Sequence, residues 1–362
     1  MGRASRQSSS TILYRMPAEW EPHAATWLAW PHNPTDWPGK FQPIGWVMAE
    51  IIRHIARVEL VRLLVDDAAD EERARRVLMA AHVFPSLEKN VRFHRVPTNR
   101  IWLRDSGPIF VRDSKNKLTI TDWRFNAWAK YDDWQLDDKV PVFAQRVLEL
   151  PRVQPEWRGK RVVLEGGSID VNGAGLMLTT EECLLSDVQQ RNPGLSREDI
   201  EGVFRQYLGI EKTLWLERGI AGDDTHGHID DIARFVSKHT IVAAYEDDRS
   251  DPNHEILHDN FERLVRMTDQ RGRKLRIVKI PMPAPVWFKN QRLPASYANF
   301  YIANQLVLVP VFNDPNDRIA LNTLAELMPG RKVVGIYCGD FVLGLGTLHC
   351  MTQQEPAVST RQ

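Results

Sequence analysis

Small residues recur along this chain at nearly constant spacing, and each begins a segment of similar form. The five are Gly107, Gly167, Gly227, Ser296 and Gly346, at spacings of 60, 60, 69 and 50. A short extended stretch that carries a polar motif, a turn and an apolar strand are expected at each one, over residues 106–120, 167–178, 227–243, 296–311 and 346–352. A repeated unit of this length cannot cover its own apolar face and is completed by its neighbours. The spacing therefore predicts a ring of like units.

Helical and buried-strand patterns lie between these segments. Apolar residues recur at positions three and four apart, which predicts helices over 44–58, 71–82, 137–149, 197–207, 254–269 and 318–327. Short apolar runs predict buried strands over 59–65, 274–280 and 332–337. Each unit is expected to be a mixed sheet with a helix outside, within one α/β domain over residues 15–362. Pro-rich breaks such as 281–285 are expected to join units and not to separate domains.

Composition excludes several classes of protein. With 362 residues, 43% of them hydrophobic, the chain can build a substantial core. Its 47 basic and 47 acidic residues cancel, so no general attraction to nucleic acid or to a membrane surface is expected. Residues 1–14 are expected to form a disordered tail and not a signal peptide, and the apolar runs are too short to span a bilayer. Three cysteines make no disulfide framework, which favours a reducing, cytoplasmic location.

Four polar motifs stand beside the recurring small residues, over 102–108, 165–168, 227–230 and 344–350. They supply one thiol, one imidazole and three carboxylates, from Cys350, His228, Asp105, Glu165 and Asp230. Carboxylates pair with the fork of a guanidinium, while a thiolate can attack its central carbon as a histidine moves protons. This set of groups therefore suits a planar cationic substrate with an electrophilic carbon.

These motifs, with segments 16–23 and 352–357, resemble in order those of the agmatine deiminase and bacterial, Porphyromonas-type peptidylarginine deiminase family of guanidine-modifying enzymes. The resemblance covers nearly the whole chain. It implies the family's five-bladed α/β propeller, the pentein fold, a pseudo-fivefold repeat of mixed sheet plus helix whose first strands converge on a central axis. It also implies a hydrolase that acts on C–N bonds of linear amidines and requires no metal or organic cofactor.

The resemblance implies a role for each motif residue. Asp105 and Asp230 would clamp the guanidinium, and Cys350 would attack it to form a covalent thiouronium. His228, hydrogen-bonded to Glu165, would move protons. The thiol could lose its proton to His228, or the bound cation could itself favour the thiolate, and the sequence leaves both routes open.

Trp102, Trp128 and Asp224 are expected to bind the rest of the substrate. Asp224 stands where the family places a carboxylate that meets the distal amine of agmatine. Conversion of agmatine to N-carbamoylputrescine and ammonia, a step of putrescine and polyamine biosynthesis, is therefore expected. Free or peptidyl arginine is the alternative within the family, and it differs from agmatine at its far end, where arginine has a carboxylate and agmatine an ammonium.

Three segments depart from the usual agmatine deiminase pattern. Residues 344–348 read Gly-Leu-Gly-Thr-Leu, where the family commonly has Gly-Gly-Gly-Asn-Ile. Asp224 and His226 stand where a Glu and an Asn are more usual, and Lys130 lies in a loop where glycines are common. These departures bear on the substrate and not on the chemistry.

Two other classes of function are kept open. His226, His228 and Asp230 alternate along the chain as zinc ligands do, but the metallo-hydrolase pattern continues with another His and this chain has Asp231. Some pentein-fold proteins bind partners and catalyse nothing, but they lack the nucleophile present here. Cys183 and Cys338 are expected in the core. The expected partner is a small cationic guanidinium compound, and self-association is left open.

Overall fold

Five sheets share one strand pattern in the computed structural model, which describes residues 14–358. Each contains an antiparallel pair whose second strand has a parallel neighbour. The three-stranded sheets are β10 (Asp170–Val171), β11 (Leu176–Thr180), β12 (Lys212–Leu216); β13 (Ala233–Ser237), β14 (Thr240–Tyr245), β15 (Arg276–Pro281); and β18 (Tyr301–Ala303), β19 (Leu306–Val311), β20 (Lys332–Tyr337). The four-stranded sheets are β21 (Gln353–Pro356), β2 (His23–Ala29), β3 (Leu60–Val65), β4 (Val91–Arg95); and β1 (Tyr14–Arg15), β5 (Ile109–Asp113), β6 (Leu118–Thr121), β7 (Arg152–Val153).

Two small ribbons and several single turns complete the strands and loops. The ribbons are β8 (Glu156–Trp157) with β9 (Lys160–Arg161), and β16 (Trp287–Phe288) with β17 (Gln291–Arg292). The turns away from the motifs are η1 (Pro34–Asp36), η2 (Glu88–Asn90), η3 (Ala127–Ala129), η4 (Asp137–Lys139) and η7 (Phe341–Gly344). The tail expected over residues 1–14 lies outside the described residues, apart from Tyr14. Among residues 14–358, no helix combines the length and the hydropathy that a membrane crossing needs.

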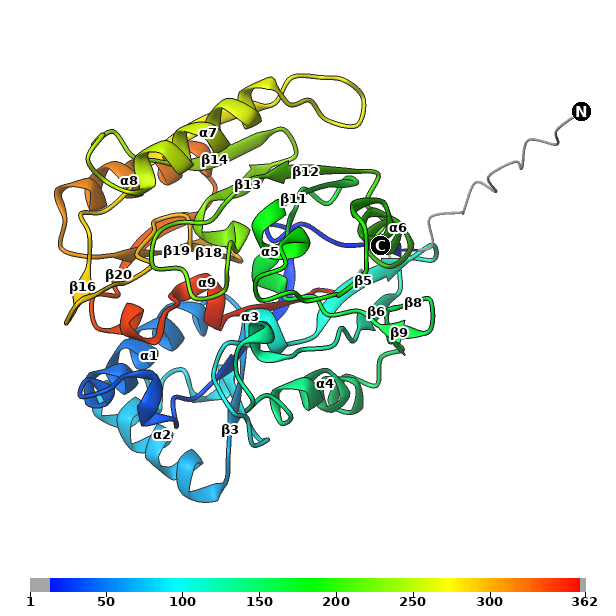
Figure 1. Cartoon of the computed structure of the whole chain (residues 1–362). Helices are drawn as coiled ribbons and strands as arrows, with labels where there is room; N and C mark the ends of the chain where they lie inside the picture. Colours follow the sequence, from blue (N-terminus) through cyan, green and yellow to red (C-terminus); the bar gives the residue numbers. More distant parts are fainter. Residues whose placement is uncertain (1–13, 359–362) are drawn as a thin grey trace, which may run out of the picture.

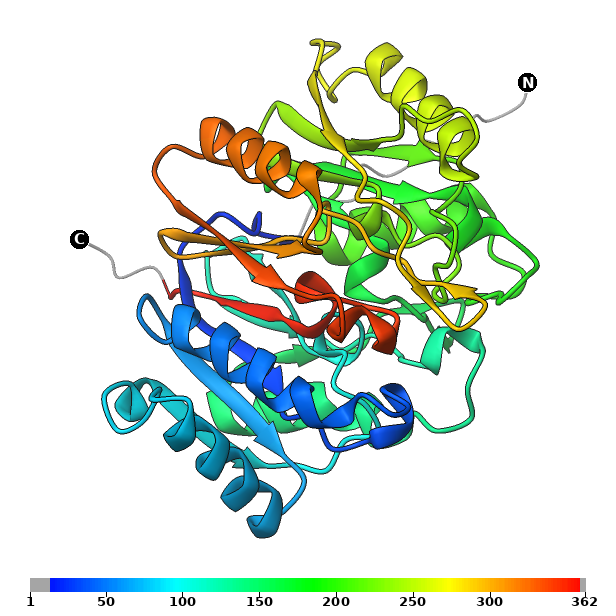
Figure 2. The same cartoon turned by 90° about the vertical axis from the view of Figure 1, so that its left-hand side faces the viewer.

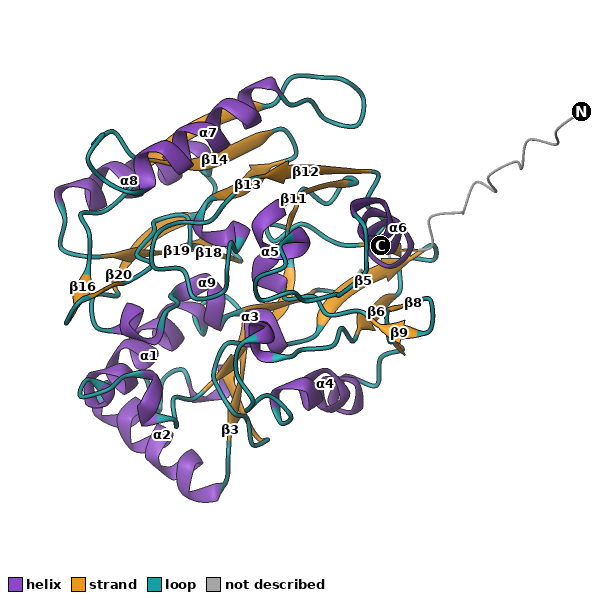
Figure 3. Ribbon diagram, viewed as in Figure 1, coloured by secondary structure: helices purple, strands orange, loops and turns teal. Residues whose placement is uncertain are grey.

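Long helices lie outside the sheets (Figure 3). They are α1 (Phe41–Ile55), α2 (Ala68–Ala80), α4 (Val140–Leu148), α6 (Arg197–Leu208), α7 (Asn253–Arg266) and α8 (Pro315–Leu327). Local signals set their ends: Ser196 and Asp199 form a capping box at the start of α6, and Gly209 ends it at φ 71°. The six predicted helices are confirmed with no bound moved by more than three residues, and the predicted strands are β3, β15 and β20.

One sheet is assembled from both ends of the chain. The C-terminal strand β21 pairs antiparallel with β2, with Gln353 opposite Trp27. Figure 2 shows this red strand beside the dark blue one. Segment 346–352 was expected to contain its own turn and apolar strand, and this expectation is wrong. The segment instead contains the short helix α9 (Leu348–Met351), because β2 near the other end of the chain supplies the strand that β21 pairs with.

The polar motifs lie on single helical turns and not on the extended stretches that were expected. These turns are α3 (Leu103–Ser106), η5 (Gly166–Ser168), η6 (Ile229–Asp231) and α9. Helix α3 contacts both η5 and α9, and η5 contacts η6. In Figure 1 the short helices α3, α9 and α5 (Glu181–Leu185) lie near the centre, with the long helices around the rim. Motifs far apart in sequence therefore meet in one place.

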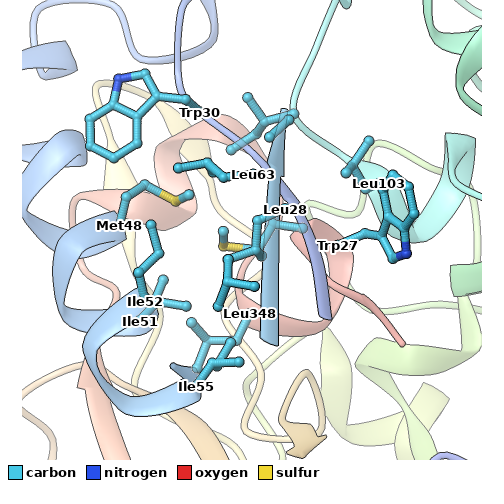
Figure 4. Close-up of a cluster of buried hydrophobic side chains, with 14 of the residues drawn as sticks. Trp27, Leu28, Trp30, Met48, Ile51, Ile52, Ile55, Leu63, Leu103 and Leu348 are labelled. Carbon is cyan, nitrogen blue, oxygen red and sulfur yellow. The ribbon is translucent and has the colours of Figure 1, made fainter. Parts of the chain in front are cut away.

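Apolar side chains next to the motif residues fix these turns. Leu348 of α9 points into a cluster formed by α1 with Leu28 and Leu63 (Figure 4). Leu103 of α3 belongs to the same buried cluster. Full burial of one such side chain contributes about 1.5–3 kcal/mol relative to an exposed one. The turns that carry Asp105 and Cys350 are thus anchored from the apolar side.

Candidate active site

A cavity of about 690 Å³ opens where the single turns meet. Five of the predicted site residues line it, namely Trp102, Asp105, Trp128, Asp224 and Cys350. The other three, Glu165, His228 and Asp230, are buried next to Asp105. The structure therefore brings all eight predicted residues to one site, and their chemical roles remain predictions.

Gly167 lies between three of these side chains. Its N–H donates to Asp105 Oδ1 at 3.0 Å. A Cβ on this residue would lie 2.6 Å from His228 Nδ1, 2.8 Å from Asp105 Oδ1 and 3.1 Å from Asp230 Oδ2. Any side chain here would displace the three groups, so glycine is required by close approach. One of the recurring small residues thus marks the centre of the site.

Asp105 and Asp230 are crowded with other charges. His228 Nδ1 lies 3.8 Å from Asp105 Oδ1 and 4.0 Å from Asp230 Oδ1. Burial raises the pKa of Asp105 to about 6, against the lowering effect of His228 and with a further raising effect from Asp230. The Trp128 indole N–H donates to Asp105 Oδ2 at 2.9 Å and fixes its orientation.

The Cys350 thiol lies among these carboxylates. Its Sγ is 3.7 Å from Asp230 Oδ2, to which the thiol donates, and it accepts from Asn299 Nδ2 at 3.1 Å. Burial, with the charges of Asp230, Asp231 and Asp105, raises the pKa of the Cys350 thiol well above its usual range. The thiol is therefore protonated at neutral pH.

His228 is held as an imidazolium. Burial lowers its pKa, but Asp105, Cys183 and Glu165 together raise it well above the ordinary value. Glu165 Oε2 lies 3.6 Å from His228 Nε2, which is an ion-pair contact and longer than the predicted hydrogen bond. Burial opposes ionisation of Glu165, but Arg191 and His228 outweigh it and lower the pKa of Glu165 to about 2. Arg191 Nε donates to Glu165 Oε1 at 3.1 Å.

Cys183 is buried as expected, but it also contacts the site. Ligand atoms of Cys183, Glu165 and His228 all lie within 4.8 Å of one another, close enough to share a metal ion. The zinc alternative needed His226 with His228 and Asp230, and these three do not form such a group among residues 14–358. The backbone is left-handed at His226 and Gly227, with φ 65° and 94°, so the segment is not the extended strand that would place His226 and His228 on one face. His226 Nε2 lies 3.2 Å from Ser186 Oγ instead.

Asn299 joins the nucleophile to its neighbours, although no motif predicted it. Besides its contact with Cys350, its Nδ2 donates to Asp231 Oδ1 at 3.0 Å. Its Oδ1 accepts from Thr347 Oγ1 at 2.7 Å and from the backbone N–H of His349 at 3.0 Å. Asn299 therefore fixes the turn that carries Cys350.

A buried ionic chain leads away from Asp230, and it too was not predicted. His349 bonds Asp230 Oδ2 through Nδ1 at 2.7 Å and Glu19 Oε2 through Nε2 at 2.8 Å. Arg234 donates to the same Glu19 oxygen at 2.9 Å and to Asp170 Oδ2 at 2.7 Å. Burial raises the pKa of Asp230, but the hydrogen bond and the charge of His349 outweigh burial. The net effect lowers the pKa of Asp230, so this carboxyl stays ionised.

The repeat contains a signal for these residues. Asp170, Asp230, Asn299 and His349 each stand three positions after one of the recurring small residues. An alignment of the five units on Gly107, Gly167, Gly227, Ser296 and Gly346 would have placed them together.

Asp224 at the mouth of the cavity already has partners. Its Oδ2 accepts from the Tyr131 hydroxyl at 2.7 Å, and its Oδ1 accepts from the Lys130 ammonium. The loop before Lys130 has three successive residues with positive φ, Ala127, Trp128 and Ala129, at 48°, 59° and 53°. The carboxylate expected to meet a substrate cation thus meets a lysine of the same chain.

Comparison with known proteins is consistent with this site. The family model for Porphyromonas-type peptidyl-arginine deiminases matches residues 15–356. The agmatine deiminase of Ectopseudomonas mendocina (strain ymp) is 36% identical over 95% of this chain and 96% of its own length.

Solved structures give the same result. The agmatine deiminase of Enterococcus faecalis superposes with a TM-score of 0.86 at 33% identity, covering 96% of each chain. A cysteine-to-serine variant of the C. jejuni agmatine deiminase, solved with substrate bound, superposes with a TM-score of 0.84 at 30% identity, covering 96% of this chain and 97% of its own.

Proposed function

The chain belongs to the Porphyromonas-type peptidyl-arginine deiminase family, and on that premise we propose that it hydrolyses the guanidinium of agmatine. The products are N-carbamoylputrescine and ammonia. The observation that carries this proposal is a cavity lined by the Cys350 thiol and the Asp105 carboxylate, with the Asp230 carboxylate 3.7 Å from the Cys350 Sγ and the imidazolium of His228 beside Asp105. Agmatine is the compound that the relatives of known activity are named for.

Binding of the guanidinium activates the thiol. The substrate cation would lie between Asp105 and Asp230, where it offsets the carboxylate charges that raise the pKa of Cys350. His228 already carries a proton, so it cannot accept the one from the thiol. Of the two routes left open by the sequence, these charges favour the bound cation, with the thiol proton passing to solvent.

Attack by the thiolate on the central guanidinium carbon then gives a tetrahedral adduct. The His228 imidazolium donates its proton to the departing nitrogen, ammonia leaves, and a thiouronium on Cys350 remains. Neutral His228 next removes a proton from water, and the resulting hydroxide adds to the same carbon. The C–S bond breaks as the hydroxyl proton passes to the departing sulfur, which releases the ureido product and the free thiol of Cys350. Glu165 and its partner Arg191 hold His228 in place.

The test is formation of a ureido product from agmatine, free arginine and a peptide with C-terminal arginine. We expect agmatine to give the highest kcat/KM. Arginine in either form is the second candidate, because Lys130 neutralises the carboxylate that would reject its distal group. Absence of ureido product from all three substrates would reject the proposal.

We further propose that the five sheets are the blades of a pentein-type α/β propeller. The common strand pattern and the pairing of β21 with β2 support this architecture. Three free cysteines support a cytoplasmic enzyme, which fractionation of the source cells would test. The carboxylates of the site support a small guanidinium compound as the partner, and the balanced charge supports a protein with no nucleic-acid or membrane partner. Gel filtration would test whether the chain self-associates.

A further inference from the structure

An ion pair of the protein itself stands at the outer end of the cavity. Asp224 lines the cavity together with Tyr131, and the Lys130 ammonium contacts the Asp224 carboxylate directly. The Lys130 side chain is 38% exposed and that of Asp224 is 15% exposed. The pair therefore lies where solvent and substrate can both reach it.

We propose that Lys130 is a specificity-determining residue whose ammonium takes the place of the substrate's distal ammonium beside Asp224. The inference rests on the proposed function, in which the substrate is a guanidine with a cationic far end. Such a substrate binds by displacing Lys130 from Asp224, while its guanidinium enters between Asp105 and Asp230. Lys130 thus acts as a competitor tethered to the enzyme.

The charges around Asp224 determine what this competitor does. With Lys130 in place, the pair carries no net charge. Arg100 nearby is bonded to Asp36 and Asp133, and Lys289 adds a further cation to the cavity wall. The mouth therefore attracts a distal ammonium less strongly, and repels a distal carboxylate less strongly, than Asp224 alone would. Lys130 therefore reduces the difference in affinity between agmatine and arginine.

Displacement of Lys130 requires movement of its side chain only. Gln189 Nε2 donates to the backbone carbonyls of Trp128 and Asp224, at 3.1 Å and 3.2 Å, and so joins the two loops. Trp128 is held at Asp105 as well. The lysine stem is long and flexible, and partly exposed ion pairs are weak, so exchange of one ammonium for another is easy.

The experiment compares Lys130→Met, which keeps the apolar stem, with the native enzyme on three guanidines. Agmatine has a distal ammonium, free arginine a distal carboxylate beside its α-ammonium, and butylguanidine an uncharged end. We expect Lys130→Met to lower KM for agmatine about two- to fivefold, which corresponds to about 0.4–1 kcal/mol. KM for arginine rises by a smaller factor, because its α-ammonium partly offsets the charge of its carboxylate. KM for butylguanidine stays nearly the same, and kcat changes less than KM for each.

Two further variants control the result. Lys130→Arg keeps the cation and is expected to keep the native KM for agmatine. Lys89→Met removes an exposed lysine of η2 and is expected to leave all three KM values as they are. If Lys130→Met is poorly folded, Lys130→Gln replaces it in the same comparison.

The inference is overturned if KM for agmatine is unchanged or raised when Lys130 loses its charge. It is also overturned if all three guanidines respond equally, because a loop defect would not distinguish their far ends. Failure of the proposed function has a different signature, namely no ureido product from agmatine with the native enzyme. In that event calorimetric binding of agmatine to the native and Lys130→Met proteins decides the inference, with tighter binding to the variant expected.

Discussion

The floor of the cavity and its mouth hold the same kinds of charges in opposite environments. Beneath the floor, which Asp105 and Cys350 line, Glu165 and Arg191 form an ion pair whose side chains are both 0% exposed. At the mouth, Lys130 and Asp224 form a pair with 38% and 15% exposed side chains. Breaking a buried pair leaves an uncompensated charge and costs about 3–5 kcal/mol, whereas an exposed pair contributes about 0–1 kcal/mol.

This difference in burial assigns the reaction to the buried groups and the choice of substrate to the groups at the mouth. Groups at the floor hold one another in fixed positions and protonation states, so a change to one of them affects the reaction or the fold. Groups at the mouth can be exchanged at little cost in stability. Substrate preference in such a site can therefore change while the reaction remains the same.

The largest expected effect is at the nucleophile. Cys350→Ser should lower agmatine turnover at least about a thousandfold, because a neutral hydroxyl is a far weaker nucleophile than a thiolate. Circular dichroism and thermal melting should show a native fold. The matched control is Cys338→Ser, at a buried cysteine that does not line the cavity, which should keep most activity if the protein stays folded. A near-normal rate for Cys350→Ser would disprove the mechanism.

Glu165→Gln tests whether a buried ion pair contributes more to stability than an exposed one. It leaves Arg191 buried without a counter-charge, so urea unfolding should show a loss of about 3–5 kcal/mol. Glu72→Gln, which breaks the exposed pair with Arg76, should cost less than about 1 kcal/mol. Equal losses from the two variants would show that burial does not determine what breaking an ion pair costs in this protein.

The same variant has a pH signature with a definite sign. The pKa of Glu165 falls from 4.5 to about 2 on folding, so its contribution to stability is full above pH 4.5 and is lost as pH falls toward 2. Unfolding free energy measured against pH should therefore fall less steeply over this window in Glu165→Gln than in the native protein.

Much of this architecture could be predicted from the sequence, because its signals are local. Apolar periodicity located the helices, and the recurring small residues located the turns that carry Asp105, His228 and Cys350. Asn299 and His349 stand three positions after the small residues Ser296 and Gly346, so an alignment of the units would have predicted them as well. Four of the five units have a polar residue at this shared position, and the unit that begins at Gly107 has Phe110 there.

Contacts between distant segments could not be predicted. Arg191 bonds Glu165 across 26 residues, and Lys130 bonds Asp224 across 94. Neither pair has a fixed spacing, since each depends on how two loops meet. For the same reason Cys183 was expected only as a core residue, and its contact with His228 was not foreseen.

The fall of kcat/KM at low pH should reflect protonation of Asp105. Its pKa is raised to about 6, and a protonated carboxyl cannot pair with a guanidinium. We expect kcat/KM for agmatine to fall about tenfold per pH unit below this pKa. Agmatine itself keeps both charges in this range. If kcat/KM stays constant through pH 6 in a protein that remains folded, Asp105 is still ionised there. Burial would then not raise the pKa of Asp105 as expected.

A smaller effect is expected at the mouth. Asp224→Asn should raise KM for agmatine about three- to tenfold and lower kcat less, because the distal amine is held about equally in ground and transition states. The freed Lys130 ammonium adds repulsion in the same direction. Asp132→Asn, at an exposed neighbouring aspartate, is the control and should leave KM unchanged. If Asp224→Asn leaves agmatine kinetics as they are, the assignment of agmatine fails while the deiminase assignment stands.

The smallest expected effect is that of chelation. Glu165, Cys183 and His228 offer carboxylate, thiol and imidazole ligands of the kinds that zinc takes. Two charges oppose a cation there: Arg191 is bonded to Glu165, and the raised pKa of His228 keeps a proton on the ring that a metal would need. Purified enzyme should therefore contain no stoichiometric zinc, and exhaustive chelation should leave agmatine turnover intact. Loss of activity on chelation, restored by zinc in the native enzyme and not in Cys183→Ser, would instead place a metal at the floor.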